Sequence, residues 1–289
     1  MATKIFTKQY QAIFSRIFDT RSHFVRSFGG NVQTFDGVSD SENMMYVKTN
    51  TTEAVLKTYS TDANTAFGTG TGSTNRFGQR TEIKSIDTAV PYEQPISIHE
   101  GVDNVTVNDV PDQVIAERFE LNALATTEYI NGLLGKAISD NASETLTGAL
   151  SEDGVTKLFA DAHKKFVNNK IKTDITWVAY VNTDVYNFLI DSKLATTAKQ
   201  SSANVDEQTL YKFKGFLLAE TPDEYFQTGE QAYFVADNVG VVGLGFSIIR
   251  TIDSEDFYGV AIQGASKYGK YIPDANKKAI IKAKLAPAV

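Results

Sequence analysis

The chain of 289 residues contains no cysteine and only three histidines. Without cysteine there is neither a disulfide framework nor a zinc site built on thiolates, so a small secreted scaffold held together by disulfides is excluded. His23, His99 and His163 lie far apart in the sequence, which argues against a histidine-rich metal site. We therefore expect neither a metal ion nor another cofactor.

The sequence also lacks an apolar run of the roughly twenty residues that a membrane-spanning helix needs. Its first residues, MATKIFTKQYQAIF, do not contain the continuous apolar segment of a signal peptide. We expect a protein that folds in the cytoplasm and does not enter a membrane. The formal net charge is −7, and this acidic balance disfavours nucleic-acid recognition as the main task, because that work depends on clustered positive charge.

Two glycine-rich stretches have some of the features of phosphate-binding loops. The stretch TAFGTGTGSTNRFG, residues 65–78, lacks the lysine and the hydroxyl that must follow the last glycine. Nearer the C-terminus, Gly264, Gly269 and Lys270 have the right spacing, but Tyr271 stands where serine or threonine is needed, and a proline two residues later opposes the required helix. The sequence predicts no nucleotide site, and residues 65–78 are interpreted as an exposed tip between two strands.

The sequence does not contain a convincing catalytic constellation. Ser97, His99 and Asp103 are the residue types of a hydrolytic triad, but they crowd one predicted strand and the turn that follows it. Ser97 and His99 would point the same way without facing each other, and no GxSxG turn is present. His163 is expected on the exposed face of a helix. The sequence predicts no enzyme, and a hydrolase that uses His99 or His163 is the least favoured alternative.

The N-terminal residues form a predicted amphipathic arm. Phe6, Tyr10, Phe14 and Ile17 recur at helical spacing. Basic residues are interspersed among them: Lys4, Lys8, Arg16, Arg21 and Arg26. The apolar face of the arm can pack on the protein's own core or on a neighbouring chain.

Residues from Met44 to about His99 have a β pattern rich in threonine, valine and isoleucine. Strand-like segments lead into and out of residues 65–78, which makes this stretch the tip of a long and largely polar hairpin. Such a ribbon has too little apolar area to form its own core, and an isolated two-stranded hairpin is at best marginally stable in water. Something outside the ribbon must hold it.

The longest helical pattern follows the hairpin and ends at about Asn141. Asp109 can cap this helix and Pro111 lies in its first turn, while apolar residues fall on one narrow face. Its glutamates are expected on a solvated face: Glu117, Glu120 and Glu128. A helix, a strand, a second helix and several strands come next, and a strand pair and a final strand end the chain, which predicts an α+β protein.

This order of elements, together with FYGVAIQG at residues 257–264 and Tyr268-Gly269, resembles the major capsid proteins of tailed double-stranded-DNA bacteriophages. The resemblance covers nearly the whole chain and implies their α+β fold. It implies five parts, in chain order: an N-terminal arm (1–40), an extended loop hairpin with flanking strands (41–100), a peripheral domain with the spine helix (101–150), an axial domain (151–245), and return strands that complete the peripheral domain (246–289).

The resemblance further implies a structural, non-enzymatic protein of the virion capsid, assembled in the host cytoplasm. Its copies would form hexamers and pentamers of an icosahedral shell around packaged double-stranded DNA, which they would meet by non-specific proximity. Besides other copies of itself, a separate scaffolding protein, a portal and decoration proteins are candidate partners. The same fold forms bacterial encapsulin compartments, which enclose an enzyme and are the alternative interpretation.

The resemblance places the contacts between subunits in the tip of the extended loop and in the arm. The predicted contacts are Phe67, Arg76, Phe77 and Arg80 in the tip, and Phe6, Tyr10 and Phe14 in the arm. The arginines would meet a neighbour's carboxylates, and the aromatic rings would provide apolar anchoring. Some relatives join a lysine of this loop to an asparagine of the next subunit. Since the tip here carries arginine, which cannot act as that nucleophile, a non-covalent shell is expected.

Overall fold

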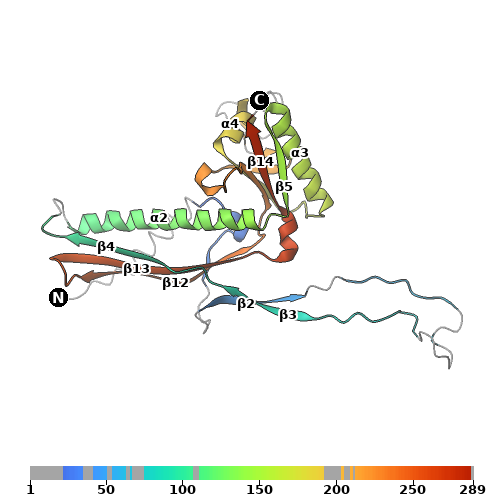
Figure 1. Ribbon diagram of the computed structural model, residues 1–289, viewed down its shortest axis with the longest axis horizontal. Helices are drawn as coiled ribbons and strands as arrows, with labels where there is room; N and C mark the ends of the chain where they lie inside the picture. Colours follow the sequence, from blue (N-terminus) through green and yellow to red (C-terminus); the bar gives the residue numbers. More distant parts are fainter. Residues whose placement is uncertain are drawn as a thin grey trace. The chain divides into compact units, whose positions relative to one another are not determined.

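The computed structural model describes residues 22–34, 42–50, 54–62, 66, 75–106, 111–191, 203–204, 209–210 and 212–287. The chain divides into two compact units (Figure 1). The larger unit comprises Met1–Gly37 and Tyr92–Val289, and the smaller one is the hairpin unit, Val38–Pro91. The arm residues Phe6, Tyr10 and Phe14, the tip residue Phe67 and the predicted cap Asp109 lie outside the described residues.

In the larger unit, the long helix α2 (Pro111–Asp140) packs along a four-stranded sheet (Figure 1). The sheet has the order β1-β12-β13-β4, with these bounds: β1 (Gln33–Thr34), β12 (Val241–Asp253), β13 (Gly259–Tyr271) and β4 (Ile96–Asp103). Ile115 and Phe119 of α2 form a small core with Val102 and Ile262 of the sheet. The helix predicted to end at about residue 141 is therefore confirmed.

The long hairpin of β12 and β13 contains the C-terminal glycine-lysine stretch. Gly264 pairs with Ile249 of β12 on one side and with Ile98 of β4 on the other, and Lys270 lies farther along the same strand. The stretch thus forms a continuous strand, and not the strand-loop-helix of a phosphate loop.

Tyr92, the first residue of the larger unit after the hairpin, is fixed on this sheet. Its ring covers Gly245, where a Cβ atom would come within 2.7 Å of the ring carbons, so no other residue fits there without a shift. The Nζ of Lys267 lies 4.8 Å from the ring centroid in cation–π geometry. The register of β12 shifts between Leu244 and Phe246, on either side of this glycine.

The second sheet of the larger unit has six strands in the order β5-β14-β11-β6-β10-β9. Their bounds are β5 (Glu144–Leu150), β14 (Ile280–Pro287), β11 (Ala232–Ala236), β6 (Trp177–Val181), β10 (Phe216–Glu220) and β9 (Lys212–Phe213). The helices α3 (Glu152–Asn168) and α4 (Thr183–Asp191) belong to the same part of the chain, and the Ser151 side chain caps α3 by accepting from the N–H of Gly154. Short elements complete the fold: η1 (Val25–Phe28), η2 (Asp223–Tyr225), η3 (Asp274–Ala279), β7 (Ala203–Asn204) and β8 (Thr209–Leu210).

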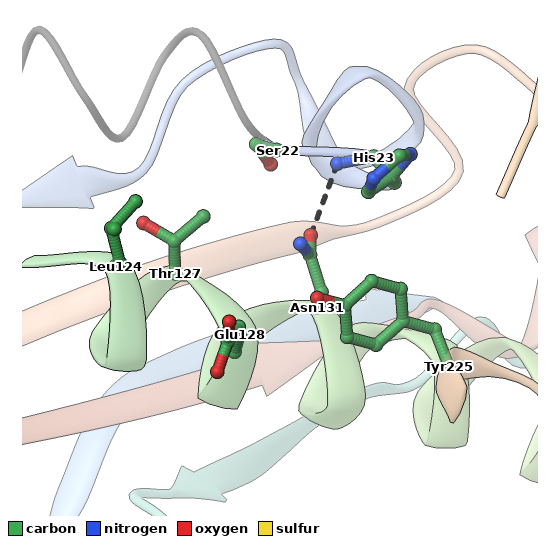
Figure 2. Close-up of a pocket in the computed structure, with 7 residues that line it drawn as sticks. All are labelled: Ser22, His23, Leu124, Thr127, Glu128, Asn131 and Tyr225. Atoms are coloured by element: carbon green, nitrogen blue, oxygen red, sulfur yellow. Dashed lines mark hydrogen bonds between the residues drawn. The ribbon is translucent and has the colours of Figure 1, made fainter. Parts of the chain in front are cut away.

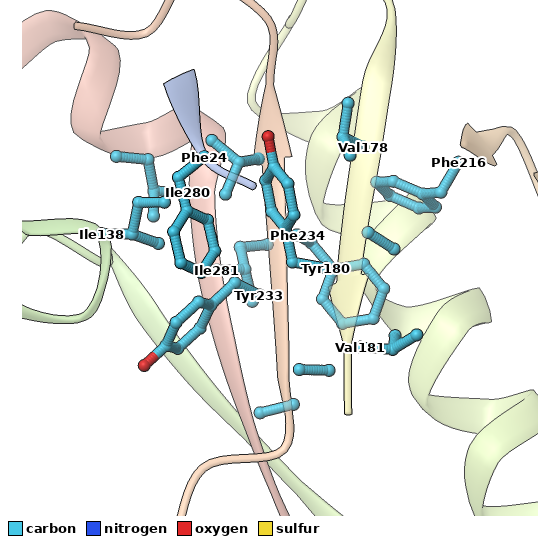
Figure 3. Close-up of a cluster of buried hydrophobic side chains, with 14 of the residues drawn as sticks. Phe24, Ile138, Val178, Tyr180, Val181, Phe216, Tyr233, Phe234, Ile280 and Ile281 are labelled. Carbon is cyan, nitrogen blue, oxygen red and sulfur yellow. The ribbon is translucent and has the colours of Figure 1, made fainter. Parts of the chain in front are cut away.

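The central strands β6 and β11 are buried along their whole length, WVAYV and AYFVA, as expected for strands covered on both faces. On one face, Phe159 of α3 contacts Phe234 edge-to-face with a centroid distance of 5.0 Å. On the other face, Phe24 packs edge-to-face on Tyr180 at 4.8 Å (Figure 3). The segment that precedes η1 therefore belongs to the main core.

Two strands differ from what the sequence pattern indicated. β5 was not predicted as a strand, and β14 was grouped with residues 246–271. In the structure β14 pairs with β5 and β11, because η3 carries the chain from β13 to the other sheet and the buried Ile281, Ala283 and Leu285 alternate along it. Residues 280–287 therefore lie beside residues 144–150 and 232–236, and the assignment of peripheral and axial domains stays a prediction.

A buried ion pair joins the end of α2 to the six-stranded sheet. The Glu230 carboxylate accepts from Lys282 Nζ at 2.9 Å, from the Tyr233 hydroxyl at 2.7 Å and from Ser139 Oγ of α2 at 3.1 Å. Burial raises the pKa of Glu230, but the hydrogen bonds from these three groups outweigh that effect and lower it overall. The folded structure thus stabilises the ionised form of Glu230.

The hairpin unit contains the antiparallel strands β2 (Asn43–Asn50) and β3 (Ser85–Pro91). Their pairing runs from Asn43 opposite Pro91 to Asn50 opposite Ser85, with a register shift between Asn43 and Met45. The segments beyond these strands, residues 54–62 and 75–84, are described but form no regular ladder.

Replacement of Glu230 tests the buried ion pair. Glu230→Gln should destabilise the protein by about 3 kcal/mol at neutral pH, because the Lys282 ammonium loses its buried counter-charge. The pKa of Glu230 is lowered in the folded state, so its stabilising effect is complete above the ordinary carboxyl value of about 4.3 and is lost as the pH falls through the folded-state value. The difference in free energy of unfolding between wild type and variant, measured by urea denaturation, should therefore shrink toward acid.

Glu255→Gln, at an exposed position, is the matched control and should change stability by less than about 0.5 kcal/mol. A difference between wild type and Glu230→Gln that stays constant from neutral to acidic pH would contradict the assigned role of the carboxylate.

Candidate functional site

The two faces of the β2–β3 ribbon differ in polarity. Because successive residues of a strand point to opposite faces, the register places Lys48 and Asp87 opposite each other on one face and Val47 and Thr88 on the other. Ile86 extends the second face and is 55% exposed. The ribbon thus carries an apolar face whose outer part is open to solvent in the single chain.

Farther out, the two arms of the hairpin are held together by a small set of contacts, here called the distal clasp: Lys57, Tyr59 and Ser60 on one arm, and Arg76, Phe77 and Gln79 on the other. The rings of Tyr59 and Phe77 meet edge-to-face with a centroid distance of 5.1 Å. The N–H of Ser60 donates to the Arg76 carbonyl at 3.0 Å, and Lys57 Nζ donates to the Gln79 carbonyl. The clasp brings together residues that lie 16 to 22 positions apart, beyond the end of the strand pairing.

Met44 and Val90 are buried, but most of the other large apolar side chains in the described part of the hairpin unit are exposed: Tyr46, Val55, Leu56, Tyr59, Phe77, Ile83 and Ile86. Leu56 is 98% exposed, Phe77 75% and Ile83 68%. A monomeric protein rarely leaves such residues together at its surface, and grouped exposure of this kind marks an interaction surface. Electrostatics add little here, since Lys84 pairs with Glu82 at 3.3 Å while both side chains stay mostly exposed.

The structure locates three of the seven residues predicted for contacts between subunits. Phe77 and the Arg76 backbone belong to the distal clasp, and Arg80 lies exposed three residues farther on. Leu56 was not among the residues predicted from the sequence. The signal that could have found it is the adjacent apolar pair Val55-Leu56 within a largely polar hairpin. The most exposed of the hairpin's large apolar residues thus lies on the arm before the glycine-threonine stretch.

The residues considered for hydrolysis are not brought together. Ser97 and His99 lie exposed on the same face of β4, and His99 Nε2 is 3.5 Å from the side-chain amide of Gln263. Asp103 accepts from the backbone N–H of Val105 at 2.8 Å. His163 is exposed on α3, with its ring 5.6 Å from that of Trp177.

Among residues 22–287 as far as they are described, no group of three or more histidine, cysteine, aspartate or glutamate side chains could hold a metal ion. Within the same residues, no helix has the length and the apolar character to cross a membrane.

Comparison with known proteins gives a result at the level of structure. No protein-family model matches the sequence, and no curated protein matches it. The capsid structure of cyanophage P-SCSP1u is similar with a TM-score of 0.66 at 10% identity, covering 92% of this chain and 89% of the other. The mature capsid of bacteriophage PhiM1 is similar with a TM-score of 0.66 at 12% identity, covering 92% and 87%.

A virus-like particle from Pyrococcus furiosus is also similar, with a TM-score of 0.54 at 14% identity, covering 96% of this chain and 99% of the other. At identities this low, the similarity of the structures shows a shared fold and nothing more. The chain thus has the α+β fold of phage capsid proteins, and the fold expected from the sequence resemblance is confirmed.

Backbone protection in the unassembled chain tests the description of the hairpin. The amides of residues 54–62 and 75–84 should exchange with deuterium far faster than those of β6 and β11, because the described contacts of the hairpin arms are few and exposed. Hydrogen exchange read by mass spectrometry measures both regions in one experiment. Protection of the hairpin arms equal to that of the two buried strands would contradict the description.

Proposed function

We propose that the protein is a major capsid protein whose copies assemble into a closed shell. The observation that carries the proposal is the set of exposed apolar side chains on a hairpin unit whose described residues belong to neither core cluster. Leu56, almost fully exposed, is the extreme case. Burial of apolar surface contributes about 25 cal/mol per Å². Contact with a partner would therefore gain the free energy of burial that these side chains lack in the single chain.

Another copy of the same chain is the proposed partner. The similar cyanophage and PhiM1 structures are capsids by their titles, which supports self-association. If the hairpin docks on a different patch of its neighbour, the interface is heterologous, and a heterologous interface forms a ring when the rotation between copies closes. Hexamers and pentamers, combined into an icosahedral shell, are the rings we propose.

Within this proposal the hairpin supplies the anchors of the interface. Leu56 and Phe77 would fill apolar depressions on the neighbour, as hot-spot residues do, and Arg76 and Arg80 would meet its carboxylates. Phe67 of the tip, and Phe6, Tyr10 and Phe14 of the arm, are proposed as further contacts between subunits. The distal clasp would hold the apolar side chains at a defined spacing, which lowers the entropy cost of docking.

The shell is proposed to be structural and non-enzymatic, located in the virion and assembled in the host cytoplasm. Packaged double-stranded DNA would be held by enclosure and non-specific proximity, consistent with a net charge of −7. A separate scaffolding protein, a portal and decoration proteins are proposed as additional partners.

An encapsulin-like compartment is the second candidate function, and the similarity to the Pyrococcus furiosus particle, with its TM-score of 0.54, is the observation that favours keeping it. The two candidates differ in what the shell encloses. Absorbance typical of nucleic acid in purified shells supports a capsid, whereas an enzyme that co-purifies in their interior supports a compartment.

Replacement of the most exposed hairpin residue tests the interface. Leu56→Ser should leave the free energy of unfolding of the unassembled chain within about 0.5 kcal/mol of wild type, because the side chain is already in water. The same change should abolish shells or greatly reduce their number, since a central apolar anchor is worth about 2 kcal/mol or more per contact and recurs in every subunit. Negative-stain electron microscopy and size-exclusion chromatography measure assembly.

Val167→Ser is the control, because this apolar side chain is likewise exposed to solvent, at 50%, but lies on α3 of the other unit. Equal yields of shells from wild type, Leu56→Ser and Val167→Ser would refute the hairpin contact. Failure of wild type to form particles under any condition would refute the proposed function itself.

The proposed shell is held together without covalent bonds. A lysine nucleophile needs a desolvated amine, but the Lys84 side chain is 71% exposed and Lys57 is engaged in the clasp. Purified particles boiled in detergent should therefore give a single band near 31.7 kDa on a denaturing gel. A ladder of covalent multimers would disprove this part of the proposal.

A further inference from the structure

One side of α2 carries charged and apolar residues without a described partner. Glu117, Glu120 and Glu128 are exposed, and none of them forms an ion pair within the described residues. Leu121, which is 49% exposed, and Leu124 lie between them. Their spacing of three and four residues places all five on the same side of the helix. This side is called the outer stripe of α2 below.

A hollow of about 490 Å³ lies at one end of the outer stripe (Figure 2). It is lined by Leu124, Thr127, Glu128 and Asn131 of α2, together with Ser22, His23 and Tyr225. The backbone N–H of His23 donates to Asn131 Oδ1 at 3.0 Å, which fixes the start of the described chain against α2. Ser22 Oγ is shielded from solvent and has no hydrogen-bond partner in the described structure.

The hollow therefore lies where the N-terminal segment joins the fold. This segment contains apolar residues at helical spacing, Phe6, Tyr10, Phe14 and Ile17. It also contains basic residues, opposite in charge to the glutamates of the outer stripe: Lys4, Lys8, Arg16 and Arg21. As a helix, residues 4–21 would be about 26 Å long, and the stretch of α2 from Glu117 of the outer stripe to Asn131 of the hollow is about 21 Å long.

We propose that residues 4–21 of the same chain dock along the outer stripe of α2 as an amphipathic helix and cover the hollow. The apolar side of the segment would pack on Leu121 and Leu124, and its basic side chains would flank the three glutamates. The segment is joined at Ser22 to the wall of its own docking surface, so its effective concentration there is on the order of millimolar. At this effective concentration, contacts that would be too weak to hold two separate molecules together are sufficient to keep the segment docked.

The inference goes beyond the proposed shell, because it concerns a contact within one subunit and holds or fails without assembly. The contact between neighbours that is proposed for Phe6, Tyr10 and Phe14 follows from it if the segment is exchanged between copies on assembly, as in domain swapping.

The absence of native cysteine allows a direct test by disulfide formation in the full-length, unassembled chain. Ile17→Cys is combined in turn with Leu121→Cys, Leu124→Cys and Ala125→Cys, and each double variant is oxidised under mild conditions. At least one pair should form an intrachain disulfide, seen as a faster-migrating monomer on a non-reducing denaturing gel and confirmed by peptide mass. Ile17→Cys with Val167→Cys on α3 is the matched control and should form none.

Two results of the disulfide test would overturn the inference. Disulfides that appear only between chains, as dimers, would assign the surface to a neighbour's segment. The absence of any disulfide in all three pairs would mean that the segment does not lie on α2. Neither result bears on whether wild type forms shells, so the inference and the proposed function fail separately.

Proteolysis tests the electrostatic part. Trypsin cleavage after Lys8 and Arg16 should be about tenfold faster in Glu120→Gln/Glu128→Gln than in wild type, a factor that corresponds to about 1.4 kcal/mol of docking free energy. Glu152→Gln/Glu255→Gln, changed at exposed sites away from the outer stripe, should be cleaved at the wild-type rate. Equal rates in all three proteins would show that the glutamates do not hold the segment.

Discussion

The hairpin unit is a two-stranded ribbon that leaves most of its large apolar side chains in solvent, and the function proposed for the protein depends on this constraint. Among its described residues, Met44 and Val90 are the buried apolar exceptions. Two strands present two faces, and the ribbon of β2 and β3 has no helix of its own unit packed on either face among the described residues. The distal clasp aligns the arms without creating an interior, so Leu56 and Ile83 stay in solvent. A hairpin of this kind gains stability only from surface that it does not itself contain.

The larger unit supplies rigidity. Its two sheets are joined through α2, whose first part packs on the four-stranded sheet and whose end is tied to the six-stranded sheet through Ser139 and Glu230. Arg118 of α2 adds a two-point hydrogen bond to Glu100 of β4, and these contacts lower the pKa of Glu100. Tyr92, seated on Gly245, fixes the chain at the place where it returns from the hairpin.

Local sequence patterns predicted the elements that have a clear apolar periodicity or a continuous apolar run. The long apolar periodicity of α2, the uniformly apolar runs of β6 and β11 and the position of the hairpin were all visible in the sequence. β5 was not, because its burial alternates between half-buried and exposed residues, ETLTGAL, and it is stabilised by β14 from the far end of the chain. The residues predicted for the hairpin tip were chosen for their chemistry. The exposure of Leu56 is not visible in a local pattern, because it depends on which other segments pack on that side chain.

The sequence by itself determined the class of the fold, the order of the long helices and of the apolar strands, and the absence of thiol chemistry, because these depend on composition and on periodicities of two and 3.6 residues. Tertiary structure decided which sheet each distant strand joins, and it brought Ser139, Glu230 and Lys282 into one buried cluster from three elements. It also decided which apolar residues of the hairpin lie in water. The physical reason is that burial and long-range pairing belong to pairs of segments, and a local pattern contains only one member of each pair.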